Sequence, residues 1–179
     1  MGEIKKPVAV KLIMSVISKE EIFFEKVRDR LSQKFGPLDF ESPLLPFYYT
    51  SYYEKEMGKN LKRKIISFQK LIPPDLLPEI KIFTNQLEKE FLYPQSNNRR
   101  LNLDPGYLSL SKLVLASTKN YTHRIYIGRG IYAEVTLRYK KKEGFKSWEW
   151  TYPDYRSPAY LKIFNHLREI YREQIKGSS

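Results

Sequence analysis

A run of ten residues near the start of the chain, VAVKLIMSVI at 8–17, constrains the fold more than any other feature of the sequence. The run is rich in β-branched residues, and its only charged residue is Lys11. A near-continuous apolar run of this length is typical of a strand that is buried on both faces. It is shorter than the ~18 apolar residues that a membrane-spanning helix needs, and no other stretch approaches that length. We therefore predict that the run is the first strand of a sheet.

The segment that follows this strand has the clearest helix signal in the chain. Ser18 and Glu21 have the spacing of a capping box, in which each side chain bonds the backbone N–H of the other residue. Gly36 is predicted to end the helix after Phe35. The apolar stripe of this helix would comprise Ile22, Phe23, Val27, Leu31 and Phe35.

Two more strands and a second helix are predicted next. Alternation at 46–53 indicates a strand, and the run 62–72 indicates its neighbour. Pro73-Pro74-Asp75 is predicted to open a helix that continues through residue 92. Its buried stripe would comprise Ile80, Phe83, Leu87 and Phe91. The order strand, helix, strand, strand, helix is the beginning of a ferredoxin-like split arrangement.

The second half of the chain consists of short apolar segments separated by turn residues, which is the pattern of a β-meander. The predicted strands are 100–110, 111–117, 123–130, 131–139 and 145–150. Within the first of these segments, Asp104-Pro105-Gly106 is predicted to form a turn. Ser157-Pro158 is predicted to begin a last helix with an apolar face.

These elements predict an α+β fold in a single domain over residues 1–179, with 175–179 as a frayed tail. The sheet would be mixed but mostly antiparallel, and about three helices would cover it mainly on one face. A ferredoxin-like N-terminal half would be followed by the β-meander and the C-terminal helix. The open side of the sheet would then display polar residues to a ligand.

The composition excludes several kinds of chemistry. The chain has no cysteine, so thiol catalysis, disulfides and cysteine-ligated metals are excluded. Its two histidines, His123 and His166, are far apart in sequence, which argues against a histidine-based metal site. Because no secretory signal is recognised either, a cytoplasmic location is the expectation, with no membrane partner.

Positive charge is concentrated in one part of the chain. The net charge is +12, and residues 111–146 contain nine basic side chains against two acidic ones. Such a local excess attracts an anionic partner. A Lys- and Glu-rich surface of the kind found in thermophiles would explain many of the charges, but it would not explain their uneven distribution.

A set of carboxylates lies beside tyrosines rather than in charged runs. The candidates for a metal site are Glu54, Asp104, Glu134 and Asp154, with Glu56 as a further possibility. Carboxylates that converge from neighbouring strands can hold Mg²⁺ or Mn²⁺ for phosphoryl chemistry, because hard cations prefer oxygen ligands. Alternation along 131–139 would place Tyr132, Glu134, Thr136 and Arg138 on one face.

Each of these carboxylates also has an ordinary structural interpretation. Glu134 and Arg138 would form a solvated pair on one strand face. Asp104 would shape its own turn through its backbone N–H groups. Asp154 or Ser157 would cap the last helix. The sequence leaves these alternatives open.

Basic and aromatic side chains alternate along the predicted meander. The candidate ligand-binding residues are Tyr107, Lys112, Lys119, His123, Arg124, Arg129, Tyr132 and Arg138, with Arg156 before the last helix. Lysine and arginine hold phosphates, while tyrosine rings stack on bases. The sequence has no P-loop, no Gly-x-Gly-x-x-Gly before a helix, no Gly-x-Ser-x-Gly elbow and no signature of a known RNA-binding module.

Four segments together resemble a known family. They are YYEKEMG, NLDPGYLSLSKLVLASTK, HRIYIGRGIYAEVTLRY and TYPDYRS. The chain is similar, over nearly its whole length, to a prokaryotic family described only as a domain of unknown function. Members of that family are often labelled "GTP-binding protein". The resemblance therefore implies no defined activity, although a nucleotide held by the basic sheet face is compatible with it.

Three hypotheses about function follow. The first is a binding protein for a phosphate-bearing ligand, either a nucleotide or a nucleic acid, on a basic and tyrosine-rich sheet face. The second is a metal-dependent phosphoesterase or nucleotidyl enzyme that uses the carboxylates with Mg²⁺ or Mn²⁺. The third is a protein-interaction module without a small ligand. The sequence leaves the oligomeric state open.

Overall fold

The first strand, β1 (Val10–Ser18), is buried along its whole length in the computed structural model, which describes residues 2–177. Strand β4 (Lys62–Ile72) pairs with one edge of β1, and β5 (Leu101–Leu108) pairs with the other. Both pairings are antiparallel. The prediction of a central strand that is covered on both faces is therefore confirmed.

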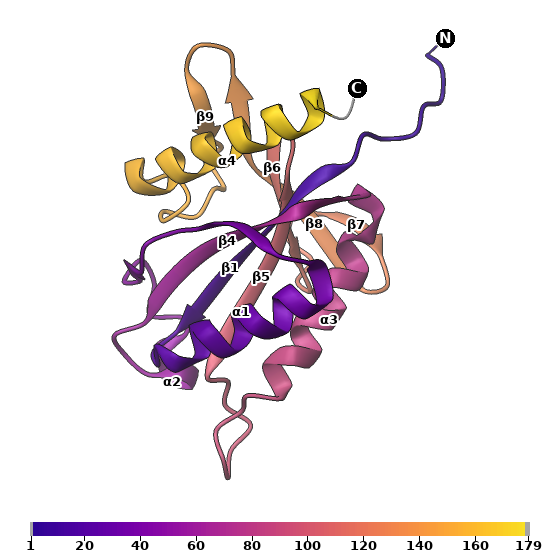
Figure 1. Cartoon of the computed structure of the whole chain (residues 1–179). Helices are drawn as coiled ribbons and strands as arrows, with labels where there is room; N and C mark the ends of the chain where they lie inside the picture. Colours follow the sequence, from indigo (N-terminus) through magenta and orange to yellow (C-terminus); the bar gives the residue numbers. More distant parts are fainter. Residues whose placement is uncertain (1, 178–179) are drawn as a thin grey trace.

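A single nine-stranded sheet extends from this centre in the order β2-β4-β1-β5-β6-β8-β7 (Figure 1). Strand β3 also pairs with β4, and β9 also pairs with β8. The remaining strands are β2 (Leu38–Glu41), β3 (Leu45–Pro46), β6 (Lys112–Ser117), β7 (Ile125–Gly128), β8 (Ile131–Lys140) and β9 (Gly144–Ser147). The structure thus confirms an α+β fold with a mostly antiparallel sheet.

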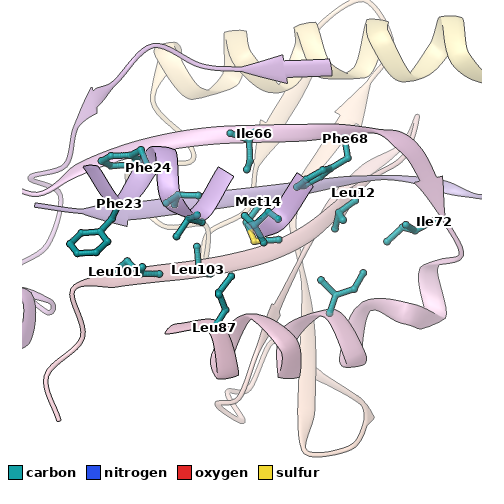
Figure 2. Packing of buried hydrophobic residues seen from close by; sticks show 14 of the residues in the cluster. Leu12, Met14, Phe23, Phe24, Ile66, Phe68, Ile72, Leu87, Leu101 and Leu103 are labelled. Carbon is teal, nitrogen blue, oxygen red and sulfur yellow. The ribbon is translucent and has the colours of Figure 1, made fainter. Parts of the chain in front are cut away.

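Helices cover both faces of the sheet. Alternate side chains of β1, including Leu12 and Met14, pack with α1 (Ile22–Phe35) and α3 (Leu77–Lys89) in one cluster, which Figure 2 shows. Ile13 points the other way and packs with α4 (Pro158–Lys176), which lies beside β9 in Figure 1. Two of the three long helices therefore share a face, and the opposite face is partly covered rather than open. We call these the α1/α3 face and the α4 face.

The short elements and the chain end complete the fold. They are α2 (Glu54–Met57) and a 3₁₀ turn at Pro74–Leu76. Helix α4 continues to Lys176, and of the tail predicted at 175–179, residues 178–179 lie outside the described residues. Within residues 2–177 there is no helix with the length and apolar character that a bilayer crossing requires.

Helix α1 ends where the sequence predicted, but its N-terminus differs from the prediction. The predicted capping box is absent, because the Ser18 hydroxyl accepts from the Glu20 N–H at 3.1 Å and Glu21 pairs with Lys62 instead. Ile22 is exposed, and Phe24 takes its place in the buried stripe. The stop at Gly36 is confirmed, with φ of 92°, a left-handed value that favours glycine.

The prediction of a strand at 46–53 is wrong for most of that segment. Only Leu45 and Pro46 pair with β4, and residues 47–53 form a loop. The aromatic alternation there serves local packing, since Phe47 is buried against Met57 and its ring contacts Tyr49 and Tyr53.

The predicted turn at Asp104-Pro105-Gly106 is also wrong, because these residues lie inside β5 and pair with β1. Strand β6 pairs with β5 only from Gly106 onward, so the first part of β5 has a strand partner on one side only. A proline is tolerated where no ladder bond is needed from its nitrogen. A side chain on Gly106 would overlap the Val114 carbonyl oxygen, so glycine allows β6 to approach there. The motif marks the point at which β5 and β6 separate.

A bulge in β8 changes which residues share a face. Leu113 pairs with Leu137 and Val114 pairs with Val135, so Thr136 is the extra residue. Glu134 lies opposite Leu115, and both Leu115 and Leu137 belong to the cluster on the α4 face. Arg138, next to Leu137, consequently points to the other face. The prediction that Glu134 and Arg138 share one face is wrong.

Candidate functional site

A pocket of about 490 Å³, which we call the sheet pocket, lies where β5 and β6 separate. Its basic lining residues are Arg63, Lys81, Arg99, Lys119 and Arg124. Its lining carboxylates are Asp104, Glu134 and Asp154. Its lining tyrosines are Tyr52, Tyr53, Tyr121, Tyr152 and Tyr155. The volume falls within the range of about 300–1,000 Å³ that is common for small-molecule sites.

One wall of the sheet pocket is built by α3 against the unpaired edge of β5. The buried Glu88 carboxylate accepts from the Leu103 N–H at 2.6 Å, and the Lys81 ammonium donates to the Leu103 carbonyl at 2.8 Å. Two helix side chains thus take the place of a strand partner at Leu103. Buried backbone polar groups need hydrogen-bond partners. Because Glu88 and Lys81 supply these partners, β5 and β6 can separate without leaving the Leu103 N–H and carbonyl unpaired.

Asp104 is fixed beside this wall. Lys81 Nζ lies 3.5 Å from Asp104 Oδ1, and Asn102 Nδ2 donates to Asp104 Oδ2 at 2.7 Å. Asn102 Oδ1 in turn accepts from Arg99 at 2.8 Å. The Asp104 side chain is 27% exposed, so it remains accessible from the pocket.

Arg99 connects the pocket wall to α2. It donates to Glu56 through Nε at 2.7 Å and through Nη2 at 2.8 Å, and to Glu88 at 3.2 Å. These hydrogen bonds hold the pKa of Glu56 below its ordinary value. Burial has the opposite effect on Glu88 and raises the pKa of that carboxyl, although the nearby charge of Lys81 opposes the shift.

A second carboxylate centre lies across the pocket on β8. Glu134 accepts from Arg124 Nε at 2.8 Å, and His123 Nε2 lies 3.0 Å from the same oxygen. The Thr136 hydroxyl, from the bulge, lies 3.3 Å from the other oxygen. Burial is the largest single effect on Arg124 and lowers its pKa, but the hydrogen bond and charge of Glu134, together with Tyr152, outweigh burial and the pKa is raised.

The third centre, formed by Arg63 and Asp154, is almost completely buried and joins β4 to the loop before α4. The Arg63 guanidinium lies 4.4 Å from the Phe47 ring centroid and 5.3 Å from that of Tyr155. Burial raises the pKa of Tyr160, which also contacts Arg63, to about 12. Among the described residues, neither the Tyr155 hydroxyl nor Arg63 Nε has a hydrogen-bond partner.

Tyrosines and one lysine surround the mouth of the sheet pocket. Tyr52, Tyr121 and Tyr152 are exposed. Lys119 Nζ donates to the Tyr52 hydroxyl at 2.6 Å and lies 4.2 Å from the ring centroid. Arg124 lies 4.4 Å from the Tyr121 ring centroid and donates to the Tyr152 hydroxyl at 3.3 Å. Cations and rings are therefore interleaved around the opening.

The structure separates the basic residues that the sequence grouped together. Lys119 and Arg124 line the sheet pocket, and His123 lies behind Glu134. The other predicted ligand-binding residues do not line it: Tyr107, Lys112, Arg129, Tyr132, Arg138 and Arg156.

These six residues lie elsewhere in the structure. Tyr107 packs against the core on the α1/α3 face, and burial raises its pKa. Arg129 pairs with exposed Glu79 at 3.1 Å, and the Tyr132 ring contacts Tyr126. Arg156 is exposed. Lys112 and Arg138 lie directly opposite each other on β6 and β8.

Three of the four predicted metal-site carboxylates, Asp104, Glu134 and Asp154, line the sheet pocket. Glu54 is exposed on α2 and does not line the pocket. Each of the three has a cationic partner, namely Lys81, Arg124 and Arg63, respectively. In the part of the chain that the structure describes, no three His, Asp or Glu side chains are close enough to hold one metal ion. The geometry therefore gives no ligand set for Mg²⁺ or Mn²⁺ there.

Arg63, Lys81 and Arg99 line the pocket but were not predicted from the sequence. A signal existed for Lys81, because Lys81, Thr84 and Glu88 recur at helical spacing and form a buried polar stripe on α3. Arg63 and Arg99 lie in strand and loop segments where a single basic residue has no distinguishing pattern.

The fold and the pocket define a small α+β protein with one polar, tyrosine-rimmed pocket at a split in its sheet. The chain belongs to the family described as domain of unknown function DUF4416, whose model matches residues 8–171. This match spans β1 to α4 and includes every residue that lines the sheet pocket. Searches of the curated proteins and of the solved structures found no match to the chain.

Proposed function

We propose that the sheet pocket binds a small phosphate-bearing ligand of nucleotide size. The observation that supports this proposal is the combination, in one pocket of about 490 Å³, of five basic side chains and five tyrosines. Cationic side chains bind phosphate through charge-assisted hydrogen bonds, and tyrosine rings stack on planar bases.

Lys119 is the cation that is best placed to receive a phosphate. It is exposed at the mouth of the sheet pocket, and its ammonium bonds a neutral partner, the Tyr52 hydroxyl. The buried cations differ, since Arg63 and Arg124 are each matched by a buried carboxylate. A phosphate at Lys119 would also meet the guanidinium of Arg124, whose Nη1 bonds the Lys119 carbonyl at 3.1 Å.

The rest of the ligand would be recognised by rings and by hydrogen-bonding side chains. Tyr52, Tyr121 and Tyr152 are 60%, 46% and 46% exposed, so ring surface is available for a base at the mouth. Farther in, Asn85 and Asp104 offer hydrogen-bonding groups for a sugar or a base edge.

Ligand-induced thermal shifts and calorimetry test the proposal. The panel contains ATP, GTP, their mono- and diphosphates, the free nucleosides and inorganic phosphate. A nucleotide at 100 times its dissociation constant is expected to raise Tm by about 5–10 °C, since binding stabilises the fold by about 2.7 kcal/mol. If no phosphate-bearing compound shifts Tm at low salt, the proposal is wrong.

Two pairs of variants localise the binding. Lys119→Gln is expected to weaken nucleotide binding about tenfold or more, because it removes a charge-assisted hydrogen bond. Lys141→Gln, an exposed lysine on the β8–β9 turn, removes the same charge outside the pocket and is the matched control. Tyr52→Leu is likewise paired with Tyr48→Leu, another exposed tyrosine that does not line the pocket. Equal losses within a pair would exclude the pocket as the binding site.

A further inference from the structure

A row of three cations crosses three neighbouring strands and is separate from the residues that line the sheet pocket. Lys112 on β6 lies directly opposite Arg138 on β8, and Arg138 lies directly opposite Lys146 on β9. Residues that are paired in this way point to the same face. Because strands lie about 4.8 Å apart, the row spans about 10 Å. We call Lys112, Arg138 and Lys146 the cation row.

The cation row is unfavourable for folding, which suggests a function. Like charges directly opposite each other in an antiparallel pair destabilise a sheet, and here two such pairs are adjacent. Within residues 2–177, neither Lys112 nor Arg138 forms an ion pair, and Lys146 has one to the exposed Glu143 at 3.5 Å. Local violations of a folding rule are concentrated at functional sites.

A continuous stack of planar groups holds Arg138 in place. Its guanidinium carbon lies 4.0 Å from the Trp148 ring centroid. Trp148 stacks on Trp150 at 5.0 Å with an interplanar angle of 10°, and Trp150 stacks on His123 at 5.7 Å and 16°. We call these four residues the planar stack. The guanidinium is thereby held against the Trp148 ring before any ligand arrives, which reduces the entropy lost on binding.

The planar stack passes around an open strand edge. Strand β7 pairs with β8 at residues 131–133, and β9 pairs with it at 137–140, so the edge between them is uncovered by strands. Trp150 Nε1 donates to the Val135 carbonyl at 3.2 Å on that edge. One end of the stack is Arg138 in the cation row, and the other end is His123, which contacts Glu134 at the sheet pocket.

We propose that the cation row binds the backbone of a single-stranded nucleic acid, with a base added to the planar stack on Arg138. The three cations would contact successive phosphates. A base would lie on the guanidinium side that faces away from Trp148, since Arg planes stack on unpaired bases. This site is distinct from the sheet pocket and does not depend on the function proposed for that pocket.

Intrinsic fluorescence gives a direct measurement of this binding. The chain has two tryptophans, and both are in the planar stack. Titration with ten-nucleotide single strands of uniform RNA and of uniform DNA is expected to change their emission. With three phosphate contacts on a single strand, log K is expected to fall with log salt with a slope of about −2.

Matched double variants identify the surface. Lys112→Gln with Lys146→Gln leaves the planar stack intact, and it is expected to weaken oligonucleotide binding at least tenfold and to reduce the salt slope by about 1.4. Lys141→Gln with Lys142→Gln removes the same charge from the β8–β9 turn and is expected to change affinity less than twofold. Lys119→Gln, in the sheet pocket, is expected to leave oligonucleotide binding unchanged.

Any one of several results would overturn the proposal. They are unchanged tryptophan emission with saturating oligonucleotide, equal losses in the two double variants, equal affinity for heparin at the same charge concentration, and tighter binding of duplex than of single strands. Loss of oligonucleotide binding in Lys119→Gln would instead assign the nucleic acid to the sheet pocket and would likewise overturn it. Mononucleotide binding in the sheet pocket is measured separately, so the two proposals can fail independently.

Discussion

Glu56 illustrates how a single side chain connects stability to pH in this protein. It forms two hydrogen bonds with Arg99, which in turn contacts Glu88 and Asn102 in the wall of the sheet pocket. The pKa of Glu56 is lowered mainly by these hydrogen bonds. A carboxyl whose pKa is lower in the folded state stabilises the fold above its unfolded pKa, and that stabilisation is lost as the pH falls through the folded pKa.

Replacing Glu56 with Gln is therefore expected to lower the free energy of unfolding by about 1.5–3 kcal/mol at pH 7, because a charge-assisted bidentate pair is removed. The difference from the unmodified protein should shrink as the pH falls below the ordinary value of 4.5. Urea unfolding at several pH values measures it. Glu54→Gln, two residues away and exposed, is the control and should have little effect at any pH. A difference that is independent of pH would contradict the ionic explanation.

At the residue scale, most of the carboxylates that stood out from their neighbours in the sequence lie close together in the fold. Asp104, Glu134 and Asp154 are acidic residues in aromatic or apolar segments, and all three line one pocket. Glu54 had the same local signal but lies on the exposed side of a four-residue helix. The sequence did not indicate that Arg63 is buried, because it lies between Lys62 and Lys64 and nothing in the sequence distinguishes it from these two lysines.

Helix α3 performs a task that is normally performed by a strand. Glu88 and Lys81 bond the N–H and the carbonyl of Leu103, where β6 has separated from β5. Glu88 contributes an oxygen acceptor to the Leu103 N–H and a carboxylate to the Arg99 guanidinium, while burial raises the pKa of its carboxyl.

Two substitutions of Glu88 separate these contributions. Glu88→Ala leaves the buried Leu103 N–H without an acceptor and is expected to cost about 1–3 kcal/mol. Glu88→Gln keeps a carbonyl oxygen and should cost less. Hydrogen exchange at the Leu103 amide should accelerate in the alanine variant and remain slow in the glutamine variant. Glu79→Ala, exposed on the first turn of the same helix, is the control. Equal acceleration in both Glu88 variants would show that the charge is what matters.

At the element scale, periodicity predicted the long elements well and the irregularities poorly. Strand β4 has the predicted bounds of 62–72, and α4 buries most of its predicted apolar face. The tripeptide Asp104-Pro105-Gly106 has the composition of a turn, yet it lies in a strand because β1 pairs with it and β6 does not. The bulge at Thr136 has no sequence signature, since it is defined by the register of β6 against β8.

At the scale of the whole molecule, β1 joins the two main cores. Its alternate side chains enter the cluster with α1 and α3 on one face and the cluster with α4 on the other. Neither cluster can lose its packing without disturbing the strand that both share.

We therefore expect one cooperative unfolding transition for the whole chain. Tryptophan emission, which reports on residues 148 and 150 near the end of β9, should have the same midpoint as far-UV circular dichroism. Separate midpoints would show that the β8–β9 region unfolds independently of β1. The unmodified protein at several denaturant concentrations is sufficient for this measurement.

The sequence by itself determined the α+β class, the central first strand, the long helices and the local excess of positive charge. These properties depend on apolar periodicity and on composition, which are local or summed along the chain. Only the tertiary structure decided where β5 and β6 separate and that Arg63, Lys81 and Arg99 meet Asp104 and Asp154 there. It also decided that one bulge places Glu134 and Arg138 on opposite faces. Those outcomes depend on strand register and on pairing between residues far apart in the sequence, which no local pattern specifies.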